Sequence, residues 1–427
     1  MAKDTLTITD NRTGEIYEVP ISYGTYPEYG AAIPASELRK IKASENDFGL
    51  ITYDPGYTNT GSCKSNITFV DGQRGLLRYR GYPIDQLAEK SNYLEISYLL
   101  LNGERPNQEE LNDWTENITM RTMLNESIKK VIDAFHYDAH PMGILVSTLG
   151  VLSTFYPKAK EIFDEESRTR QIWRLIAKMP TIAAYAYRHQ RGLPYVLPDN
   201  DLSYTGNFLN MLFKVTEQKY DPDPILERAL DVLFILHADH EQNCSTSVMR
   251  GVGSSQSDPY VAVAGAAAAL YGPLHGGANQ RVKEMLDEIG SPGCVVDYVD
   301  KTLAAGKRVM GFGHRVYRVE DPRGRHLKAH AEKLQDEGDP MMLETSARLI
   351  EVMDQRKGLS INVDFYSASL YTYLRLPPDL FPNLFAISRI AGWSAHILEQ
   401  YADNQLIRPR SEYRGPGKRR YRPLGER

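Results

Sequence analysis

The feature that most constrains the fold is a helical hydrophobic period that extends over most of the chain from residue 83 onward. Apolar residues recur there every three or four positions, as they do on the buried face of an amphipathic helix. Several of these runs end at a glycine, which commonly terminates helices. In residues 224–241 the expected buried stripe consists of Ile225, Ala229, Leu233 and Leu236. The sequence therefore predicts a mainly α protein.

The first 60 residues have a different pattern. Residues 5–10, 15–21 and 50–54 alternate apolar and polar side chains between Gly, Pro and Asn, which is typical of short strands. Residues 66–84 place the dipeptide Asp71-Gly72 between two apolar runs, so we expect a β-hairpin there. A small β-rich segment is thus predicted to precede the helices. The sequence contains neither a Rossmann GxGxxG motif after a strand nor a Walker A loop, so no nucleotide cradle of those kinds is predicted.

Charge and hydropathy argue against several classes of protein. The 427 residues have a formal net charge of -5, whereas a protein that mainly binds nucleic acid needs a basic surface. Residues 408–427 are locally basic, and a solvated tail or one that packs on a neighbour is favoured over a nucleic-acid arm. The longest apolar run, 261–271, is too short to span a bilayer, which takes about 20 residues. With no apolar leader and only three scattered cysteines, we expect a soluble cytoplasmic protein without a membrane partner.

Histidines occur in three unusual settings, and the first is the segment HADHE at residues 237–241. His237 and His240 are three positions apart, so they share a face if the segment is helical. They could ligate a metal together with Asp239 or Glu241, or one of them could be a buried, hydrogen-bonded residue at a helix end. The HExxH spacing of zinc hydrolases is absent from the sequence, which favours a core or substrate contact.

The second setting is GPLHGGAN, residues 272–279, where one proline and three glycines surround His275. An alanine-rich run precedes this segment and an amphipathic run follows it, so we expect a sharp turn between two helices. Since a helix N-terminus disfavours positive charge, we expect a neutral imidazole at the start of the second helix.

The third setting is GFGHRVYRVEDPRGR, residues 311–325. Two glycines before His314 allow a ligand to approach the backbone closely. Each arginine of this segment alone would be read as solvated, but the planar guanidinium matches carboxylate or phosphate oxygens, and the cluster favours anion binding. The cluster consists of Arg315, Arg318, Arg323 and Arg325. Arg389 and Arg408 lie in apolar or near-terminal segments, where each either extends along the surface or faces a buried anion.

Asp364 lies in the apolar and aromatic segment LSINVDFYSASLY. Burial of a carboxylate is unfavourable unless it is paired, and it raises the pKa, which suits a general base. The alternative is that Asp364 is a helix N-cap, because Asp is favoured at that position. The residue pattern alone leaves both interpretations open.

Taken together, these motifs resemble the citrate synthase family, in particular its long bacterial form. The resemblance covers nearly the whole chain from about residue 50 onward, and the ordered set is far more specific than any one motif. It rests on LRYRGYPIDQLAE, KMPTIAAY, ILHADHEQNCSTS, GPLHGGAN, VMGFGHRVYRVEDPR, NVDFYS and IRPR. It implies an acyltransferase that condenses acetyl-CoA with oxaloacetate and water to give citrate and CoA. The CoA thioester is then a substrate, and neither a cofactor nor a metal is implied.

The resemblance also implies a set of site residues. It places His275, His314 and Asp364 at the reaction centre. The residues expected to bind oxaloacetate are His240, Arg323, Arg389 and Arg408, the last of which would reach across a dimer interface. The residues expected to bind CoA are Val309, Met310, Gly311, Phe312, Gly313, Arg318 and Asn362.

These roles fit the chemistry of the reaction. The methyl group of a thioester is a very weak carbon acid, so its deprotonation needs a base and stabilisation of the enolate oxygen. Asp364 would be the base, and His275 would donate a hydrogen bond to the thioester oxygen. His314 would polarise and protonate the ketone of oxaloacetate. The arginines would orient the two carboxylates of oxaloacetate and draw the cleft closed.

The implied architecture has three parts: a β-rich segment over residues 1–60, a large helical domain over 61–276 and 383–427, and a small helical domain over 277–382. The active site would lie in the cleft between the two helical domains. The protein would be a homo-oligomer, at least a dimer because Arg408 completes a neighbour's site, with a hexamer as the further assembly of some long bacterial forms.

Some of those long forms are inhibited by NADH. Arg174 and Lys178 lie in plausible positions for the basic residues of that NADH site, but Glu217 stands where a cysteine is expected, which leaves NADH regulation open.

Two alternatives remain at this point. A 2-methylcitrate synthase would use propionyl-CoA with the same catalytic residues, although the long N-terminal segment favours the acetyl-CoA enzyme. A non-catalytic oligomeric protein on the same fold is disfavoured because all three catalytic residue types are present.

Overall fold

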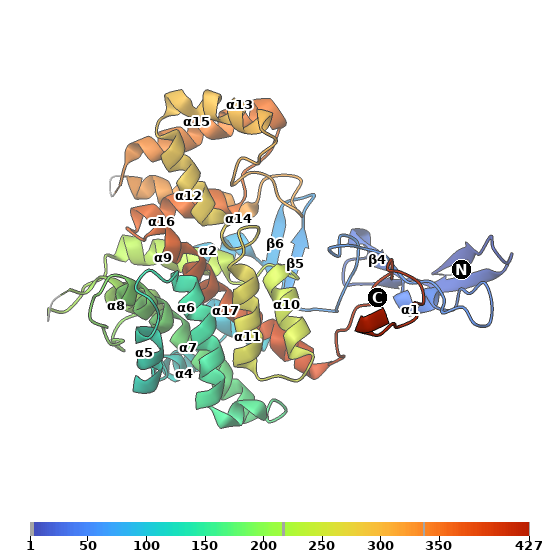
Figure 1. Cartoon of the computed structure of the whole chain (residues 1–427). Helices are drawn as coiled ribbons and strands as arrows, with labels where there is room; N and C mark the ends of the chain where they lie inside the picture. The colour runs from blue at the N-terminus through green and yellow to red at the C-terminus, as the bar shows by residue number, and fades with distance from the viewer. Residues whose placement is uncertain (1–3, 216–217, 336–337, 427) are drawn as a thin grey trace. The chain divides into compact units, whose positions relative to one another are not determined.

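A computed structural model of the chain describes residues 4–215, 218–335 and 338–426. Its internal contacts divide the chain into two units, one formed by Met1–Lys64 with Arg408–Arg427 and the other by Ser65–Ile407. Short strands predominate in the described part of the smaller unit, and helices predominate in the larger unit (Figure 1). The prediction of a mainly α protein with a small strand-containing N-terminal region is therefore confirmed. The separation into a large and a small helical domain stays a prediction.

The smaller unit contains two short antiparallel strand pairs. The two predicted strands, β1 (Thr5–Thr9) and β2 (Ile16–Pro20), are present, and they pair antiparallel with Thr5 opposite Pro20. The remaining elements are β3 (Ser22–Tyr23), η1 (Pro27–Tyr29), β4 (Ala31–Ala32), α1 (Ala35–Leu38) and η6 (Leu424–Glu426). The predicted strand at 50–54 is wrong. The N–H of Leu50 bonds to the carbonyl of Leu38, and Asp54 accepts the N–H of Thr58 in a turn, so this backbone is used in local contacts.

The predicted hairpin at the start of the larger unit is present. Its strands are β5 (Thr68–Asp71), β6 (Leu76–Tyr79) and β7 (Tyr82–Pro83), which form one antiparallel sheet. The turn spans residues 72–75, because the Asp71 carboxylate accepts the N–H groups of Gln73 at 2.8 Å and Arg74 at 3.1 Å. The carbonyl of Gly72 accepts the N–H of Arg318 at 2.7 Å, which attaches a later loop to this hairpin.

Helices form the rest of the larger unit. Their bounds are α2 Ile84–Lys90, α3 Tyr93–Asn102, α4 Gln108–Thr119, α5 Glu126–Asp133, α6 Pro141–Phe155, η2 Pro157–Lys160, α7 Glu165–Gln190, α8 Tyr204–Phe213, α9 Pro224–His237, α10 Cys244–Gly253, α11 Pro259–Leu270, α12 Ala278–Ile289, η3 Pro292–Cys294, α13 Val295–Ala304, α14 Pro322–Lys333, α15 Pro340–Lys357, α16 Val363–Tyr373, η5 Pro378–Leu380 and α17 Phe381–Ala402. Among the helices that the structure describes, none is long and apolar enough to cross a membrane.

The helical period identifies the buried stripe of α9 with one exception. Ala229, Leu233 and Leu236 are fully buried, but the side chain of Ile225 is 56% exposed. Ile225 lies in the first turn of the helix, where its neighbours Asp223 and Pro224 are also exposed. The period therefore predicts the buried face of the helix but not where the helix emerges at the surface.

Helix α17 forms the centre of the larger unit. It packs against α3, α7, α9, α10 and α11, and its side chains are buried along most of its length. Figure 1 shows α12 to α16 at one end of this unit and α4, α5 and α7 at the other. The α17 residues Arg389 and Trp393 are both fully buried, one helical turn apart. This helix thus supplies polar groups to the interior as well as apolar ones.

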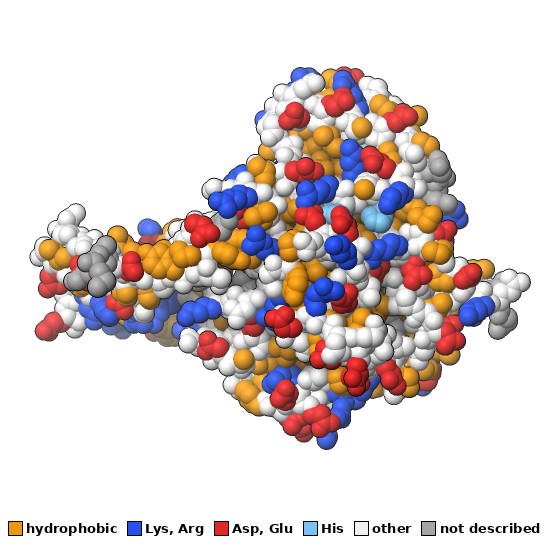
Figure 2. Space-filling view, turned by 180° about the vertical axis from the view of Figure 1, so that it is seen from behind, with side chains coloured by type: hydrophobic (Ala, Val, Ile, Leu, Met, Phe, Trp, Pro, Cys, Tyr) orange, Lys and Arg blue, Asp and Glu red, His pale blue; other side chains and the backbone are white. Residues whose placement is uncertain are grey.

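Acidic and basic side chains are interspersed over the face of the larger unit that Figure 2 shows. In the same view, Lys and Arg side chains gather on the smaller unit. The basic tail, residues 408–426, is exposed along its whole described length.

Candidate functional site

Several helix ends of the larger unit bring together residues that are distant in sequence. His240 follows the end of α9, His275 lies between α11 and α12, and Asp364 is in the first turn of α16. Arg323 lies in the first turn of α14, and Arg389 is buried on α17. The charge of Arg389 acts on the pKa values of His240, His275 and Asp364, which places these groups within electrostatic reach of one another.

The predicted turn at His275 is present. Helix α11 ends at Leu270 and α12 begins at Ala278. The N–H of Gly276 donates to the carbonyl of Leu270 at 2.9 Å, and a Cβ on Gly276 would lie only 2.6 Å from that oxygen. Only glycine permits this close approach, so the turn holds His275 at a defined position between the two helices.

The ring of His275 faces the start of α10. Its Nε2 lies 3.3 Å from the backbone N and 3.0 Å from the Oγ of Ser245, the second residue of that helix. Burial, with a further contribution from Arg389, lowers the pKa of His275 to about 4, so the imidazole is neutral at neutral pH. The helix N-terminus that contacts the ring is therefore that of α10, whereas the sequence suggested that of α12. The reason is a contact between residues 30 positions apart, which local sequence does not encode.

His314 is held by two backbone donors. Its Nδ1 accepts the N–H groups of Val316 at 3.0 Å and Tyr317 at 3.1 Å. A nitrogen that accepts hydrogen bonds carries no proton, so the proton of the neutral ring is on Nε2. Burial, followed by the charge of Arg323, lowers the pKa of His314 to about 4. His314 is thus a neutral hydrogen-bond donor through Nε2.

His240 lies beside His314. The centroids of the two rings are 5.3 Å apart, and the Nε2 of His240 is 3.1 Å from the hydroxyl oxygen of Tyr317. Burial is the main reason why the pKa of His240 is well below its ordinary value, and Arg323 adds to this shift. Both His240 and Tyr317 are buried. The segment 315–317 therefore contacts both histidines: its backbone N–H groups bond to His314, and the Tyr317 hydroxyl group contacts His240.

Two buried arginines complete this side of the site. Arg323 forms an ion pair with Asp321, and both side chains are almost completely buried. Arg389 donates from Nε to the carbonyl of His237 at 2.6 Å, while its Nη1 is buried and has no hydrogen-bond partner among the described residues. Burial lowers the pKa of Arg389 to about 10, so the guanidinium remains charged at neutral pH. A buried cationic donor without a partner is costly, and an anion bound beside it would satisfy it.

Asp364 is not the N-cap of its helix. The N-cap of α16 is Asn362, whose side-chain oxygen accepts the N–H of Asp364 at 3.1 Å. Burial raises the pKa of Asp364 to about 7, although Arg323 and Arg389 act in the opposite direction. Its Oδ1 is buried and lacks a partner within the described ranges. A carboxylate with a free oxygen and a pKa near neutrality is suited to accept a proton from a substrate.

The predicted CoA loop runs beside the start of α16. The carbonyl of Gly311 accepts the N–H of Asn362, and the N–H of Gly313 donates to the carbonyl of Ser360, both at 2.9 Å. Gly311 has a φ of +81°, and a Cβ there would lie 2.7 Å from the ring of Phe365, so glycine is required. Val309 is buried, Met310 and Phe312 are partly buried, and Arg318 is exposed. The loop is thereby attached to the helix that carries Asp364.

The predicted anion-binding residues Arg325 and Arg408 are both exposed. Arg408 belongs to the smaller unit and is exposed. Arg325 is exposed and forms an ion pair with Asp85. The prediction that Arg408 completes a neighbour's site therefore remains a proposal, while Arg325 already has a partner within the larger unit.

The HADHE segment uses its side chains within the protein. His237 is completely buried at the end of α9, where Nδ1 donates to the carbonyl of Leu233 at 2.9 Å. Asp239 lies 3.1 Å from the Nε2 of His396, which is also fully buried. Across the part of the chain that the structure describes, no group of three or more His, Cys, Asp or Glu residues is placed to hold a metal. His237 thus matches the buried, hydrogen-bonded alternative.

The two basic residues considered for an NADH site also have partners. The ammonium group of Lys178 donates to the carbonyls of Arg121 and Met123, and burial lowers its pKa to about 8. Arg174 donates to the side chain of Gln171 at 2.9 Å. Glu217 lies outside the described residues.

Four residues around the site were not identified from the sequence: Ser245, Tyr317, Asp321 and Trp393. Asp321 has a local signal, because it precedes Pro322 and caps α14, as Asp-Pro often does at a helix start. Trp393 follows Arg389 by four residues and therefore lies on the same face of α17. Ser245 has no such signal, because its contacts with His275 and Trp393 are both long-range.

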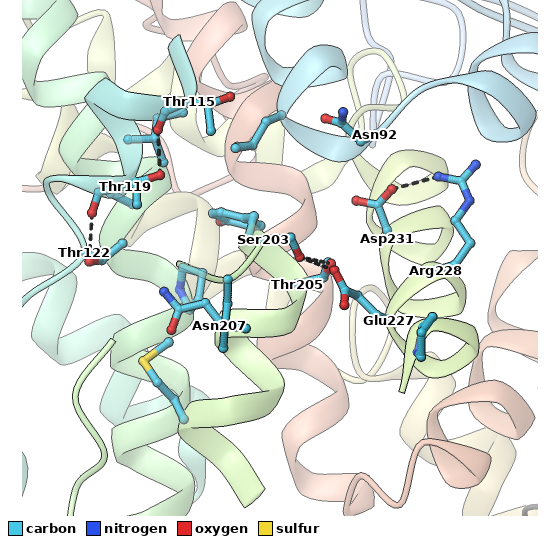
Figure 3. Close-up of a pocket in the computed structure, with 18 residues that line it drawn as sticks. Asn92, Thr115, Thr119, Thr122, Ser203, Thr205, Asn207, Glu227, Arg228 and Asp231 are labelled. Carbon is cyan, nitrogen blue, oxygen red and sulfur yellow. Dashed lines mark hydrogen bonds and ion pairs between the residues drawn. The ribbon is translucent and has the colours of Figure 1, made fainter. Parts of the chain in front are cut away.

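A cavity of about 460 Å³ opens elsewhere, between α3, α4, α7, α8 and α9. None of the residues predicted for the site lines it. Figure 3 shows two polar pairs in its wall: Ser203 is bonded to Glu227, and Arg228 is paired with Asp231 at 2.9 Å. These four side chains therefore bond to one another within the cavity wall.

Comparison with known proteins gives one consistent result. A family model described as the citrate synthase C-terminal domain matches residues 56–410. The chain is 47% identical to a citrate synthase of Dictyostelium discoideum, over 100% of this chain and 85% of that protein. It is 46% identical to a citrate synthase of Corynebacterium glutamicum, over 90% of each.

Two solved structures are similar to the chain. A citrate synthase from Pyrobaculum aerophilum superposes with a TM-score of 0.79 at 37% identity, covering 86% of this chain and 93% of that one. A citrate synthase from Thermoplasma acidophilum, in a ternary complex with carboxymethyl coenzyme A and oxaloacetate, superposes with a TM-score of 0.81 at 30% identity. That comparison covers 88% of this chain and 100% of the other.

Proposed function

Because the chain belongs to the citrate synthase family, we propose that it condenses acetyl-CoA with oxaloacetate and water through Asp364, His275 and His314. The relative from Thermoplasma acidophilum was solved with carboxymethyl coenzyme A and oxaloacetate, which supports these two substrates. The relatives reported above are citrate synthases, so the comparisons do not favour the 2-methylcitrate reaction. Some curated relatives are named as peroxisomal or glyoxysomal, and the cytoplasmic location stays a prediction.

Oxaloacetate would bind through its two carboxylates. Arg389 offers a buried Nη1 that has no protein partner among the described residues, and Arg323 offers a guanidinium held rigidly by Asp321. The neutral imidazole of His240, beside these arginines, would form a hydrogen bond near the ketone of oxaloacetate. Binding a dianion against fixed, buried cations orients the ketone for attack and lowers the entropic barrier of the next step.

Acetyl-CoA is then converted to its enolate. Asp364 removes a proton from the methyl group, the electron pair of that C–H bond forms the C=C bond of the enolate, and the π pair of the C=O bond moves to the thioester oxygen. His275, neutral and protonated on one nitrogen, donates a hydrogen bond to that oxygen as its negative charge develops. A preorganised donor of this kind contributes on the order of 3 kcal/mol to transition-state stabilisation. The pKa of Asp364, about 7, makes the carboxylate a stronger base than an ordinary aspartate.

The carbon–carbon bond forms in the following step. The enolate carbon attacks the ketone carbon of oxaloacetate, and the ketone oxygen becomes an alkoxide. The Nε2–H of His314 supplies a proton to this oxygen. Asp364 then releases the methyl proton to solvent and His314 takes up a proton from solvent, so both side chains return to their starting state. Water then hydrolyses the thioester of citryl-CoA, which releases citrate and CoA.

The observation that carries this proposal is that Asp364 Oδ1 and Arg389 Nη1 are both buried without partners among the described residues, close enough to affect one another's pKa. Asp364 is thus available as a base, and Arg389 as a group that binds an anion, in the interior of the larger unit. The test is a steady-state assay of CoA release from acetyl-CoA, with and without oxaloacetate. Oxaloacetate-dependent release supports the proposal, and a preference for propionyl-CoA would replace it with the 2-methylcitrate reaction.

We further propose that the enzyme is at least a dimer, in which Arg408 of one subunit completes the oxaloacetate site of the other. Arg408 is exposed, belongs to the smaller unit, and lies two residues before the end of the segment that the family model matches.

A further inference from the structure

We propose that Trp393 is a positioning residue that sets the tautomer of His275 through the hydroxyl group of Ser245. The inference rests on the role proposed above for His275 as a hydrogen-bond donor to the thioester oxygen. It concerns which of the two ring nitrogens carries the proton, and therefore which one can donate.

Trp393 and Ser245 are both completely buried, on α17 and α10 respectively. The indole Nε1 of Trp393 donates to the Oγ of Ser245 at 3.1 Å. The hydroxyl of Ser245 in turn donates to the Oδ1 of Asn243 at 2.7 Å. Asn243 is the N-cap of α10, and the same Oδ1 accepts the N–H of Thr246 at 3.2 Å, which fixes the orientation of the amide. The three side chains therefore form a chain of hydrogen bonds in which Trp393 donates to Ser245 and Ser245 donates to Asn243.

The donor and acceptor capacities of these groups leave few alternatives. An indole N–H can only donate and an amide oxygen can only accept, and Asn243 Oδ1 at 2.7 Å is a nearer acceptor for the single proton of the Ser245 hydroxyl than His275 Nε2 at 3.0 Å. One lone pair of the same oxygen is used by Trp393. The hydroxyl consequently has no proton left for the Nε2 of His275, which lies 3.0 Å away.

The backbone N–H of Ser245 then decides the tautomer. It lies 3.3 Å from the Nε2 of His275 and can only donate. It is one of the N–H groups of the first helical turn, which lack partners within their own helix. If Nε2 carries no proton, it accepts this N–H, and the ring proton is on Nδ1. If Nε2 carried the proton, two donors would face each other and the buried N–H of Ser245 would lose its acceptor.

Trp393 matters because it limits what the Ser245 oxygen can accept. With the indole in place, one lone pair of that oxygen remains. The hydrogen bond donated by the indole also polarises that oxygen and uses part of its accepting capacity, so without the indole a proton on Nε2 of His275 gains a better acceptor. We therefore expect Trp393→Phe to shift the population of His275 toward the Nε2–H tautomer, which removes the proton from Nδ1 and weakens the donor to substrate.

The direct readout is the ¹⁵N spectrum of full-length enzyme labelled in histidine, with the His275 signals identified from a His275→Gln sample. In the wild type, the expected shifts are those of a neutral ring protonated on Nδ1. In Trp393→Phe, the signals should move toward the Nε2–H tautomer, and kcat should fall roughly tenfold or more, since an incorrect tautomer removes the working proton. The KM for oxaloacetate should change little, because the arginines are untouched.

The chain offers a matched control. Trp114 on α4 also donates its indole N–H to a buried serine hydroxyl, Ser97 on α3, at 2.9 Å. Its ring contacts are with Tyr98 and Trp173, which are not site residues. Trp114→Phe deletes the same atoms and the same kind of hydrogen bond, so it should lower stability comparably while leaving kcat and the His275 signals unchanged.

A double-variant cycle tests whether Trp393 acts through the hydroxyl. In Ser245→Ala the backbone N–H remains and the hydroxyl is gone, so adding Trp393→Phe should cause no further loss of kcat. An equal loss in both backgrounds would overturn the inference and leave Trp393 with a packing role only. A wild-type His275 protonated on Nε2 would overturn it even if Trp393→Phe failed to fold. Since the tautomer is read without turnover, absence of condensing activity would refute the proposed function and not this inference.

Discussion

Asp321 and Arg323 form a bidentate ion pair in the interior of the protein. The Nε and Nη2 of Arg323 lie 2.9 Å and 2.7 Å from the two carboxylate oxygens of Asp321. The same carboxylate accepts the backbone N–H of Arg323 at 3.1 Å and caps α14. One aspartate thus fixes the start of a helix and the plane of a guanidinium that is expected to bind a substrate carboxylate.

The first prediction concerns Arg323→Lys. Lysine keeps the positive charge but cannot reproduce the planar fork, so one side chain cannot hold Asp321 and a substrate carboxylate in the same geometry. We expect kcat/KM for oxaloacetate to fall about 10- to 100-fold, as is typical for a lost hydrogen bond to a charged group. The measurement is a steady-state titration with oxaloacetate at saturating acetyl-CoA.

Arg325→Lys is the matched control, two residues further along α14. Arg325 is exposed and pairs with Asp85, and exposed ion pairs contribute little. This variant should retain the wild-type kcat/KM. If both substitutions reduced it equally, the assignment of Arg323 to the oxaloacetate site would be wrong.

The second prediction concerns the pH dependence of catalysis. Asp364 acts as a base only when ionised, and burial raises its pKa to about 7. The value of kcat/KM for acetyl-CoA should therefore rise as pH increases through about 7 and level off above it. A profile recorded between pH 5 and 9 checks this, and an acid limb centred near the ordinary aspartate value, about 4, would contradict the burial of this carboxylate.

The third prediction concerns stability and His275. Its folded pKa is about 4 and its ordinary value is 6.5, so between these pH values the unfolded chain binds a proton that the folded chain does not. Stability is therefore lost as pH falls through this window. One such group changes the free energy of unfolding by at most about 1.4 kcal/mol per pH unit.

His275→Gln removes this titration while retaining a polar side chain. Urea denaturation at pH 8 and at pH 5 should show a smaller loss of unfolding free energy for the variant than for the wild type. Equal losses in the two proteins would mean that His275 is protonated as readily in the folded chain as in the unfolded one.

The sequence predicts the helices, and the functional residues near their ends, better than it predicts the contacts between helices. The helical period is local, so it correctly indicates α9 and its buried residues Leu233 and Leu236. It fails at Ile225, because exposure of a first turn depends on what packs beside it. The strand expected at 50–54 fails for the same reason, since alternation indicates a strand only where a partner strand is present.

At the site, the sequence identifies those residues whose immediate sequence neighbours are unusual. The glycines around His275 and the apolar neighbours of Asp364 are signals of this kind. The N-cap alternative for Asp364 is excluded only by the structure, which assigns the cap to Asn362. The contact of Ser245 with His275 joins the first turn of α10 to the turn between α11 and α12, and a single sequence carries no signal for it.

The fourth prediction concerns Arg408. If it completes the site of a neighbouring subunit, Arg408→Ala and Asp364→Asn should each be inactive alone but complement each other in mixed dimers. Random mixing makes half of the dimers hybrid, and each hybrid has one intact site, so roughly a quarter of the wild-type activity should return. The two variants are refolded or co-expressed together and assayed for CoA release. A mixture that stays inactive would mean that Arg408 does not act across a subunit boundary.

The most direct test of the central claim compares the wild type with Asp364→Asn in the same assay. The variant is nearly isosteric and removes an unfavourable buried charge, so it should remain folded, as circular dichroism and thermal unfolding would show. We predict that the wild type releases CoA from acetyl-CoA only when oxaloacetate is present, and that Asp364→Asn lowers kcat by roughly a thousandfold or more, because the base is lost. A folded Asp364→Asn variant with wild-type kcat would contradict the account.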